Sequence, residues 1–190
     1  MKKHEYQNLY NRNPETKSMM IEVSLEDYSE IFNGWDASPI RRKDLEPELI
    51  DYLEQSGTEI PLDESVEICF YLPPTQKDLE KEQKSIVAIK NNFRVVVFFI
   101  NKRLKRGYRQ MATFIVLSLL FITSAYIIRG QEPLPLLTSI MREGLFIGGW
   151  VFLWEAFNLF FFTTHEERKR RKIFYRYLDS EIIFKDMKEV

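Results

Sequence analysis

Two apolar stretches, at residues 111–128 and 145–164, are the main feature of the pattern of hydrophobic and polar positions along this chain. Each contains at most one charged residue and is long enough, at about 1.5 Å per helical residue, to cross ~30 Å of hydrocarbon. The segment between them contains Pro133 and Pro135 and is too short for a domain. The pattern predicts two transmembrane helices, at 111–128 and 144–164, joined by a periplasmic loop at 129–143.

Three short segments outside this hairpin have the pattern of β-strands. Residues 19–25 alternate between apolar and polar positions, residues 65–72 form a second apolar run, and residues 181–187 have strand character at the other end of the chain. Because two strands alone make a marginal sheet, we expect the third strand to join the first two.

Helical patterns occupy the segments between the strands. Ser24 and Asp27 resemble a capping box for a short helix, and Asp44 is placed to cap the next helix. From residue 77 apolar residues recur at three and four positions with no proline before the membrane, which predicts one long helix leading into the first span. The β-branched run at 95–100 leaves a strand as the alternative at that point.

These elements together predict a membrane α-helical hairpin with a small cytoplasmic α/β domain built from both chain ends. The polar start of the chain has no periodicity and is expected to be a flexible tail. The predicted tail covers residues 1–18, and the cytoplasmic domain with its long helix covers 19–108. The first span, the loop and the second span follow at 111–128, 129–143 and 144–164. The C-terminal basic helix and the final strand occupy 165–190.

Lysine and arginine residues cluster at the two outer ends of the hairpin, whereas its loop has only Arg129 and Arg142. The positive-inside rule then predicts that both termini lie in the cytoplasm, with membrane lipids as partners. The alternative use of these cations is the binding of a specific acidic ligand. The expected lipid-facing anchors are Trp150, Arg106, Arg109, Arg170 and Arg171.

The overall charge and the cysteine count exclude some classes of protein. A net charge of −1 argues against a general nucleic-acid binder, which would carry a strongly basic domain. The single cysteine, Cys69, permits no internal disulfide, as expected on the reducing side of the membrane. The first residues lack the apolar core of a signal peptide, so we expect the internal spans to direct insertion.

One face of the second span carries small and polar residues. At 100° per residue, a single line contains Gly144, Gly148, Val151, Glu155 and Asn158. Glycines four residues apart allow another helix to approach closely. The partner of this face is either the first span of the same chain or the same face of a second copy, which would make the protein a homo-oligomer.

Glu155 is the most informative single residue of that face. An ionised carboxylate near the centre of a span costs roughly 2.5 kcal/mol or more, so such groups are usually paired, protonated or functional. In an antiparallel hairpin we expect Glu155 to reach the depth of Ser118 and to hydrogen bond to it or to a backbone carbonyl. Self-association and an ion or proton path are the alternatives.

A turn in the soluble part is the candidate site for a ligand or protein partner. Its members, which could also be imagined as a catalytic or metal cluster, are Asp36, Ser38, Arg41, Arg42 and Asp44. Their spacing is that of a turn followed by a helix cap. His4 and His165 lack the neighbours that a catalytic triad or zinc site needs, so we expect no enzyme activity, no metal and no cofactor.

The soluble part also resembles a known family. The residues that carry the resemblance are Ser24-Leu25, Ile31-Phe32-Asn33, Asp36-x-Ser38-Pro39 and Asp44-Leu45, before two spans and a basic C-terminal helix. The pattern F-N-x-x-D-x-S-P-x-x-x-x-D-L is similar to an uncharacterised family of small two-span bacterial inner-membrane proteins. Its members typically have an aromatic residue after the Ser-Pro pair, where this chain has Ile40. The family has no established activity, so the resemblance implies bacterial origin and topology only.

The function that fits these observations is a non-enzymatic inner-membrane protein with a cytoplasmic sensing or scaffolding domain that self-associates. The alternative is a membrane-permeabilising effector, for example of a stress or anti-phage response. In that case a ligand on the cytoplasmic domain would trigger oligomerisation of the spans.

Overall fold

The computed structural model describes residues 9–129 and 135–187, and the chain separates into two compact units. The first unit combines Met1–Phe99 with Arg170–Val190, and the second is Ile100–Lys169. Two long helices, α2 (Leu79–Arg129) and α4 (Thr164–Asp179), contribute residues to both units. Each unit is described by itself.

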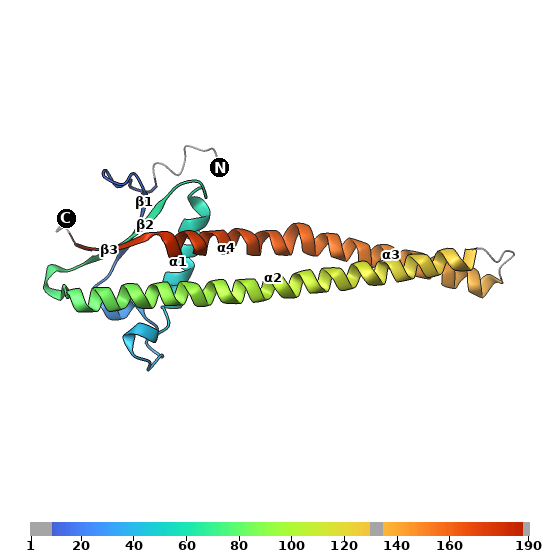
Figure 1. The fold of residues 1–190 in the computed structure, drawn as a ribbon, viewed down its shortest axis with the longest axis horizontal. Coiled ribbons are helices and arrows are strands. Elements are labelled where there is room, and N and C mark those ends of the chain that lie inside the picture. Colours follow the sequence, from blue (N-terminus) through green and yellow to red (C-terminus); the bar gives the residue numbers. More distant parts are fainter. Residues whose placement is uncertain (1–8, 130–134, 188–190) are drawn as a thin grey trace. The chain divides into compact units, whose positions relative to one another are not determined.

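A three-stranded sheet forms the centre of the first unit (Figure 1). Strands β1 (Met19–Ser24), β2 (Val66–Leu72) and β3 (Glu181–Asp186) are all parallel, with β2 in the middle. The register aligns Ile21 with Ile68 and Ile68 with Ile182, so branched side chains meet across the sheet. The prediction that a segment from the far end of the chain completes the sheet is confirmed.

The core of this unit lies between the sheet and helices α1 (Pro47–Glu59), α2 and α4. The aromatic rings of Phe93 on α2 and Phe174 on α4 meet edge to face at 5.8 Å, and Phe70 on β2 stacks on Phe184 of β3 at 5.2 Å. Gly57 of α1 allows α4 to approach closely, because a Cβ there would lie 2.5 Å from the Tyr177 hydroxyl. That hydroxyl donates to the Leu53 carbonyl.

Two half-buried cations hold the C-terminal end of α4. The Lys90 ammonium donates to the carbonyls of Tyr177, Leu178 and Ser180, which the end of the helix leaves without intrahelical partners. Burial lowers the pKa of Lys90. The Arg176 guanidinium donates to the carbonyls of Gly57 and Pro61 at 2.9 and 2.6 Å, which ties α4 to the end of α1.

The predicted helix caps need correction. The segment after β1 is a 3₁₀ turn, Tyr28–Ile31, whose cap is Asp27 and not Ser24, since the Asp27 carboxylate accepts from the Ser29 N–H. Helix α1 begins with Pro47 after Glu46, so Asp44 does not cap it. Proline needs no N–H partner at the first helical position, so this helix starts without a side-chain cap.

Residues 9–18, predicted as part of a flexible tail, lie against the sheet instead. Arg12 forms an antiparallel bridge with Met19, and the Met20 N–H donates to the Asn11 carbonyl at 2.8 Å. Polar side chains here bond to strand residues, which a periodicity argument does not detect. The remainder of that predicted tail, residues 1–8, lies outside the described residues.

Helix α2 is continuous over 51 residues, and residues 95–100 are helical, so the alternative of a strand there is wrong. Phe93, Val97, Ile100 and Leu104 are buried at helical spacing, and this burial outweighs the β-propensity of the run. Gly107 does not interrupt the helix.

The second unit contains two helices that are long and apolar enough to cross a membrane. The first is the apolar part of α2, and the other starts with α3 (Leu136–Asn158), continues through a π-helical turn at Leu159–Thr163 and leads into α4. Helix α3 begins before the predicted start at residue 144, so residues 136–143 of the predicted loop are helical.

Candidate functional site

The two apolar helices pack through a line of residues that includes Gly149, Phe152 and Ala156. A Cβ on Gly149 would lie 2.5 Å from Ile122 Cγ1 and 3.2 Å from the Ser118 carbonyl oxygen, so only glycine permits this approach. The Phe152 ring packs against the rings of Phe114 and Phe121, with centroids at 6.0 and 5.3 Å. Ala156 is buried on the same side.

Most of the predicted helix-packing face lies off this contact line. Nothing lies within 4 Å of a Cβ built on Gly144, and Val151 and Asn158 are exposed. Gly148 is at the border, with Phe121 3.1 Å from its Cβ position. The first span of the same chain is therefore not the partner of the whole face, because the hairpin uses the helix side marked by Gly149.

Glu155 does not bond to Ser118 as predicted. Ser118 is 1 % exposed and its hydroxyl has no hydrogen-bond partner within the described residues. The two side chains lie at different heights along the helix pair. Ser118 is level with Gly149, and Glu155 is six residues further along, about 9 Å at the helical rise. Among residues 9–129 and 135–187, none donates a hydrogen bond to the half-buried Glu155 carboxylate.

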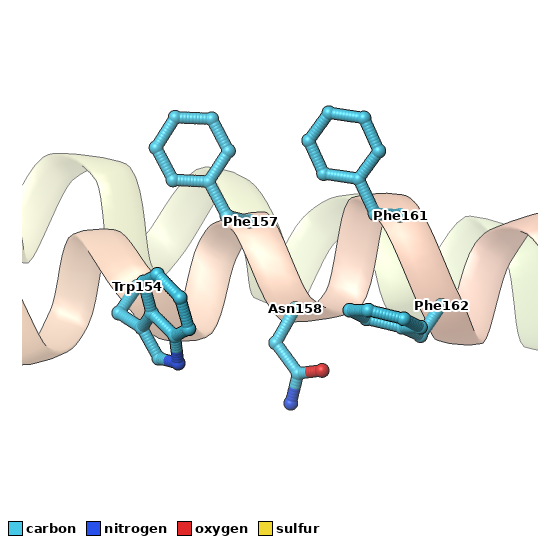
Figure 2. A pocket seen from close by; sticks show the side chains of 5 residues that line it. All are labelled: Trp154, Phe157, Asn158, Phe161 and Phe162. Atoms are coloured by element: carbon cyan, nitrogen blue, oxygen red, sulfur yellow. The ribbon is translucent and has the colours of Figure 1, made fainter.

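An apolar groove of about 530 Å³ opens on the surface of the second unit. Its lining consists of Trp154, Phe157, Asn158, Phe161 and Phe162 (Figure 2). The rings of Phe157 and Phe161 stack at 6.1 Å on one side, and Asn158 projects away from the helix between Trp154 and Phe162. Asn158 thus presents an amide with donors and acceptors on an apolar surface.

The π-helical turn follows Asn158 immediately. A π-turn adds one residue to a helical turn, and such turns are frequent at functional sites. Here it leaves Phe160, Phe161 and Phe162 all exposed in succession. Hydrophobic periodicity did not predict this feature, because an apolar run without polar residues has the same pattern in an α-helix and in a π-helix.

A stripe of cations marks the end of the second unit that precedes the apolar part of α2. A shallow groove of about 230 Å³ is lined by Lys102, Lys105, Arg106 and Arg109, all exposed. Their spacing of three and four residues puts them on one face of the helix. Arg103 instead pairs with Glu167 at 2.7 Å. Arg106 and Arg109 are exposed, and their contact with lipid stays a prediction.

The other predicted anchors differ from one another. Trp150 is 55 % exposed, which suits contact with lipid. Arg170 forms an ion pair with Glu54 of α1 at 2.7 Å within the first unit, and Arg171 is half-buried. Arg170 therefore differs from the predicted lipid anchor, because its charge already has a carboxylate partner. This ion pair holds α1 against α4.

The predicted partner turn is held together by Asp36. Its carboxylate accepts the N–H groups of Ser38 and Asp44, at 2.9 and 2.7 Å, and these bonds lower the pKa of Asp36, that from Asp44 most. Asp36, Ser38 and Asp44 are thus brought together as turn residues, while Arg41 and Arg42 are exposed on the 3₁₀ turn Ile40–Arg42.

Trp35, which the sequence analysis did not select, adjoins this turn and is 97 % exposed. Asn92 on α2 fixes the loop that follows, since its amide donates to the Lys43 carbonyl and accepts from the Leu45 N–H. A tryptophan so exposed on a loop held by side-chain bonds is a good contact residue for a protein partner. Its position next to the Asn33-Gly34 pair, which marks a turn, could have indicated that this side chain is exposed.

A polar pocket of about 470 Å³ lies where the three parallel strands begin, and Ser18, Ser65 and Ser180 each precede a strand there. Glu67, 2 % exposed, accepts from Asn13 and Thr16. Its carboxylate is thus already bonded to the protein. Within the described ranges, no group of three or more His, Cys, Asp and Glu residues is placed to hold a metal ion.

Comparison of this chain with known protein families, curated proteins and solved structures finds no match.

Proposed function

We propose that this protein is a non-enzymatic bacterial inner-membrane protein, with both termini cytoplasmic, that self-associates through the exposed face of α3. In this proposal the domain around the sheet senses a ligand or binds a protein partner through the turn that carries Trp35 and Asp36. The observation that supports self-association is the exposed Asn158 amide on an otherwise apolar helix surface.

A primary amide in hydrocarbon has donors and acceptors that lipid tails cannot satisfy. A second copy of the same helix supplies complementary groups, because each amide both donates and accepts. Gly144, with open space where a Cβ would be, and the half-buried Glu155 lie along the same line. In an isologous contact between two such faces, the Asn158 amide of one copy pairs with Asn158 or Glu155 of the other.

The test is the self-association of Asn158→Leu in detergent micelles and in bilayers. We expect about fivefold weaker association, since an intramembrane hydrogen bond is worth roughly 1 kcal/mol. Förster transfer between differently labelled copies measures it over a range of protein-to-lipid ratios. Gly144→Leu should weaken association further through steric exclusion.

The matched control is Ser124→Leu. Ser124 is also an exposed polar residue in an apolar helix, but its hydroxyl donates to the Leu120 carbonyl of its own helix at 2.7 Å. Its loss should leave association unchanged. Equal association of the Asn158→Leu, Gly144→Leu and unmodified proteins would refute the proposed interface.

The second candidate function is a membrane-permeabilising effector, and the observation that favours it is that Glu155 and Asn158 are both polar and close together on one span. Two spans of one chain enclose no pore, but several copies that turn these groups inward line a polar path. Overexpression should then depolarise the cell membrane. Gly144→Leu should abolish that effect, because it blocks the assembly of copies that lines the path, whereas unchanged depolarisation by this variant would exclude this candidate function.

A further inference from the structure

The outer edge of β3 carries backbone groups without strand partners. In the part of the chain that the structure describes, the sheet ends at β3. At the opposite edge, by contrast, the Met20 N–H of β1 donates to the Asn11 carbonyl. An uncovered edge strand is a template for pairing with another chain.

The direction of each backbone group along β3 follows from one hydrogen bond. The Met187 N–H donates to the Leu72 carbonyl of β2 at 2.7 Å, so the N–H and C=O groups of odd-numbered residues face β2. Because these groups alternate along a strand, those of Ile182, Phe184 and Asp186 face the free edge.

The side chains of β3 also alternate between two faces. Ile182 is buried on the helix side, and Phe184 stacks there on Phe70 and contacts Tyr28. Glu181, Ile183 and Lys185 therefore lie on the opposite face, where the Lys185 ammonium is 3.7 Å from Met20 Sδ.

We propose that β3 pairs antiparallel with β3 of a second copy, across a two-fold axis at Ile183. In this register Ile182 exchanges backbone hydrogen bonds with Phe184 of the second copy, which uses the groups that face the free edge. Glu181 then lies opposite Lys185 of the second copy, and Lys185 opposite its Glu181. The strand is thus complementary to itself in backbone pairing and in charge.

Other two-fold registers lose this complementarity. An axis at Phe184 sets Glu181 opposite Met187 and Lys185 opposite Ile183. An axis at Lys185 sets two ammonium groups opposite one another, which is destabilising. Only the axis at Ile183 matches both ion pairs, so charge selects the register.

This interface joins two sheet domains and does not depend on the proposed contact between apolar helices. Each contact can form without the other, because the two contacts use different residues. The test must therefore report on β3 itself rather than on the total number of copies in a complex.

Cysteine cross-linking in the full-length protein in membranes gives that local readout. Directly opposed, non-hydrogen-bonded positions have Cα atoms about 4.5 Å apart, within disulfide range. Ile183→Cys should form an intermolecular disulfide rapidly. The background must be Cys69→Ala, because Cys69 is the partner of Ile183 on β2 and would form an internal bridge. Glu26→Cys, at an exposed position, is the control for random collision.

Charge exchange tests the register. Glu181→Lys and Lys185→Glu should each slow cross-linking at position 183 about tenfold, because each places two pairs of like charges opposite one another. The double variant Glu181→Lys/Lys185→Glu restores opposite charges across the axis and should restore the rate. Loss of fold cannot produce such a rescue.

The proposal is overturned if Ile183→Cys cross-links no faster than Glu26→Cys. It is also overturned if the double variant stays as slow as the single ones. Cross-linking through Ile183→Cys should persist in the Gly144→Leu protein, because the β3 contact forms without the helix contact. Its loss in that protein would overturn the proposal of an independent β3 interface.

Discussion

At the residue scale, Glu67 combines deep burial with a charge that polar neighbours support. Burial alone would raise its pKa, but hydrogen bonds from Thr16, Asn13 and Ser18 outweigh burial and lower the pKa below the ordinary value. A carboxylate with a lowered folded-state pKa stabilises the fold above its unfolded-state pKa, and this stability is lost as pH falls through the folded-state pKa.

We therefore expect the unmodified protein to lose protection of β1 and β2 against amide exchange below about pH 4.5, after correction for intrinsic rates. Glu67→Gln should reduce protection at pH 7, by about 1–3 kcal/mol, because its amide NH₂ faces donors. It should also flatten the acid dependence. A variant whose protection declines with acid as steeply as that of the unmodified protein would show that another group titrates.

At the element scale, the second span has two glycines with opposite roles. Gly149 is in close contact with α2, whereas Gly144 faces open space. Gly149→Val should destabilise the helix pair by about 1–3 kcal/mol through overpacking. Gly144→Val should leave it unchanged apart from the helix propensity of the residue.

Thermal unfolding at a high detergent-to-protein ratio, where copies are separated, measures this difference in stability. The two variants differ only in the position of the added side chain, so each controls for the other. Equal midpoint temperatures for both variants would contradict the packing of Gly149 against Ile122 and Ser118.

At the scale of the whole molecule, the positions of the cations predict the topology. With both ends of the chain cytoplasmic, a membrane-impermeant maleimide applied to intact cells should label Leu136→Cys and not Lys169→Cys, both in a Cys69→Ala background. Leu136 and Lys169 are both exposed, so accessibility within the protein is matched. Permeabilised cells should label both, and the reverse pattern in intact cells would overturn the topology.

Local sequence pattern was sufficient to predict several helices and strands. Apolar length predicted two long apolar helices. Alternation predicted β1, an apolar run predicted β2 and strand-forming residues predicted β3, each within one residue of its observed bounds. The continuity of α2 was also predicted, since no proline occurs in it, although the run at 95–100 left a strand as the alternative. These features follow from local burial and steric preference, which every residue carries with it.

Tertiary structure alone decided which helix side is in contact and which polar groups are paired. Glu155 does not bond to Ser118, because the close contact of Gly149 with Ile122 sets how far one helix is shifted along the other. That contact joins residues far apart in sequence. Arg170 met Glu54, and residues 9–18 met Glu67, for the same reason. Periodicity identifies a face of an element, but only the surface opposite that face determines its partner.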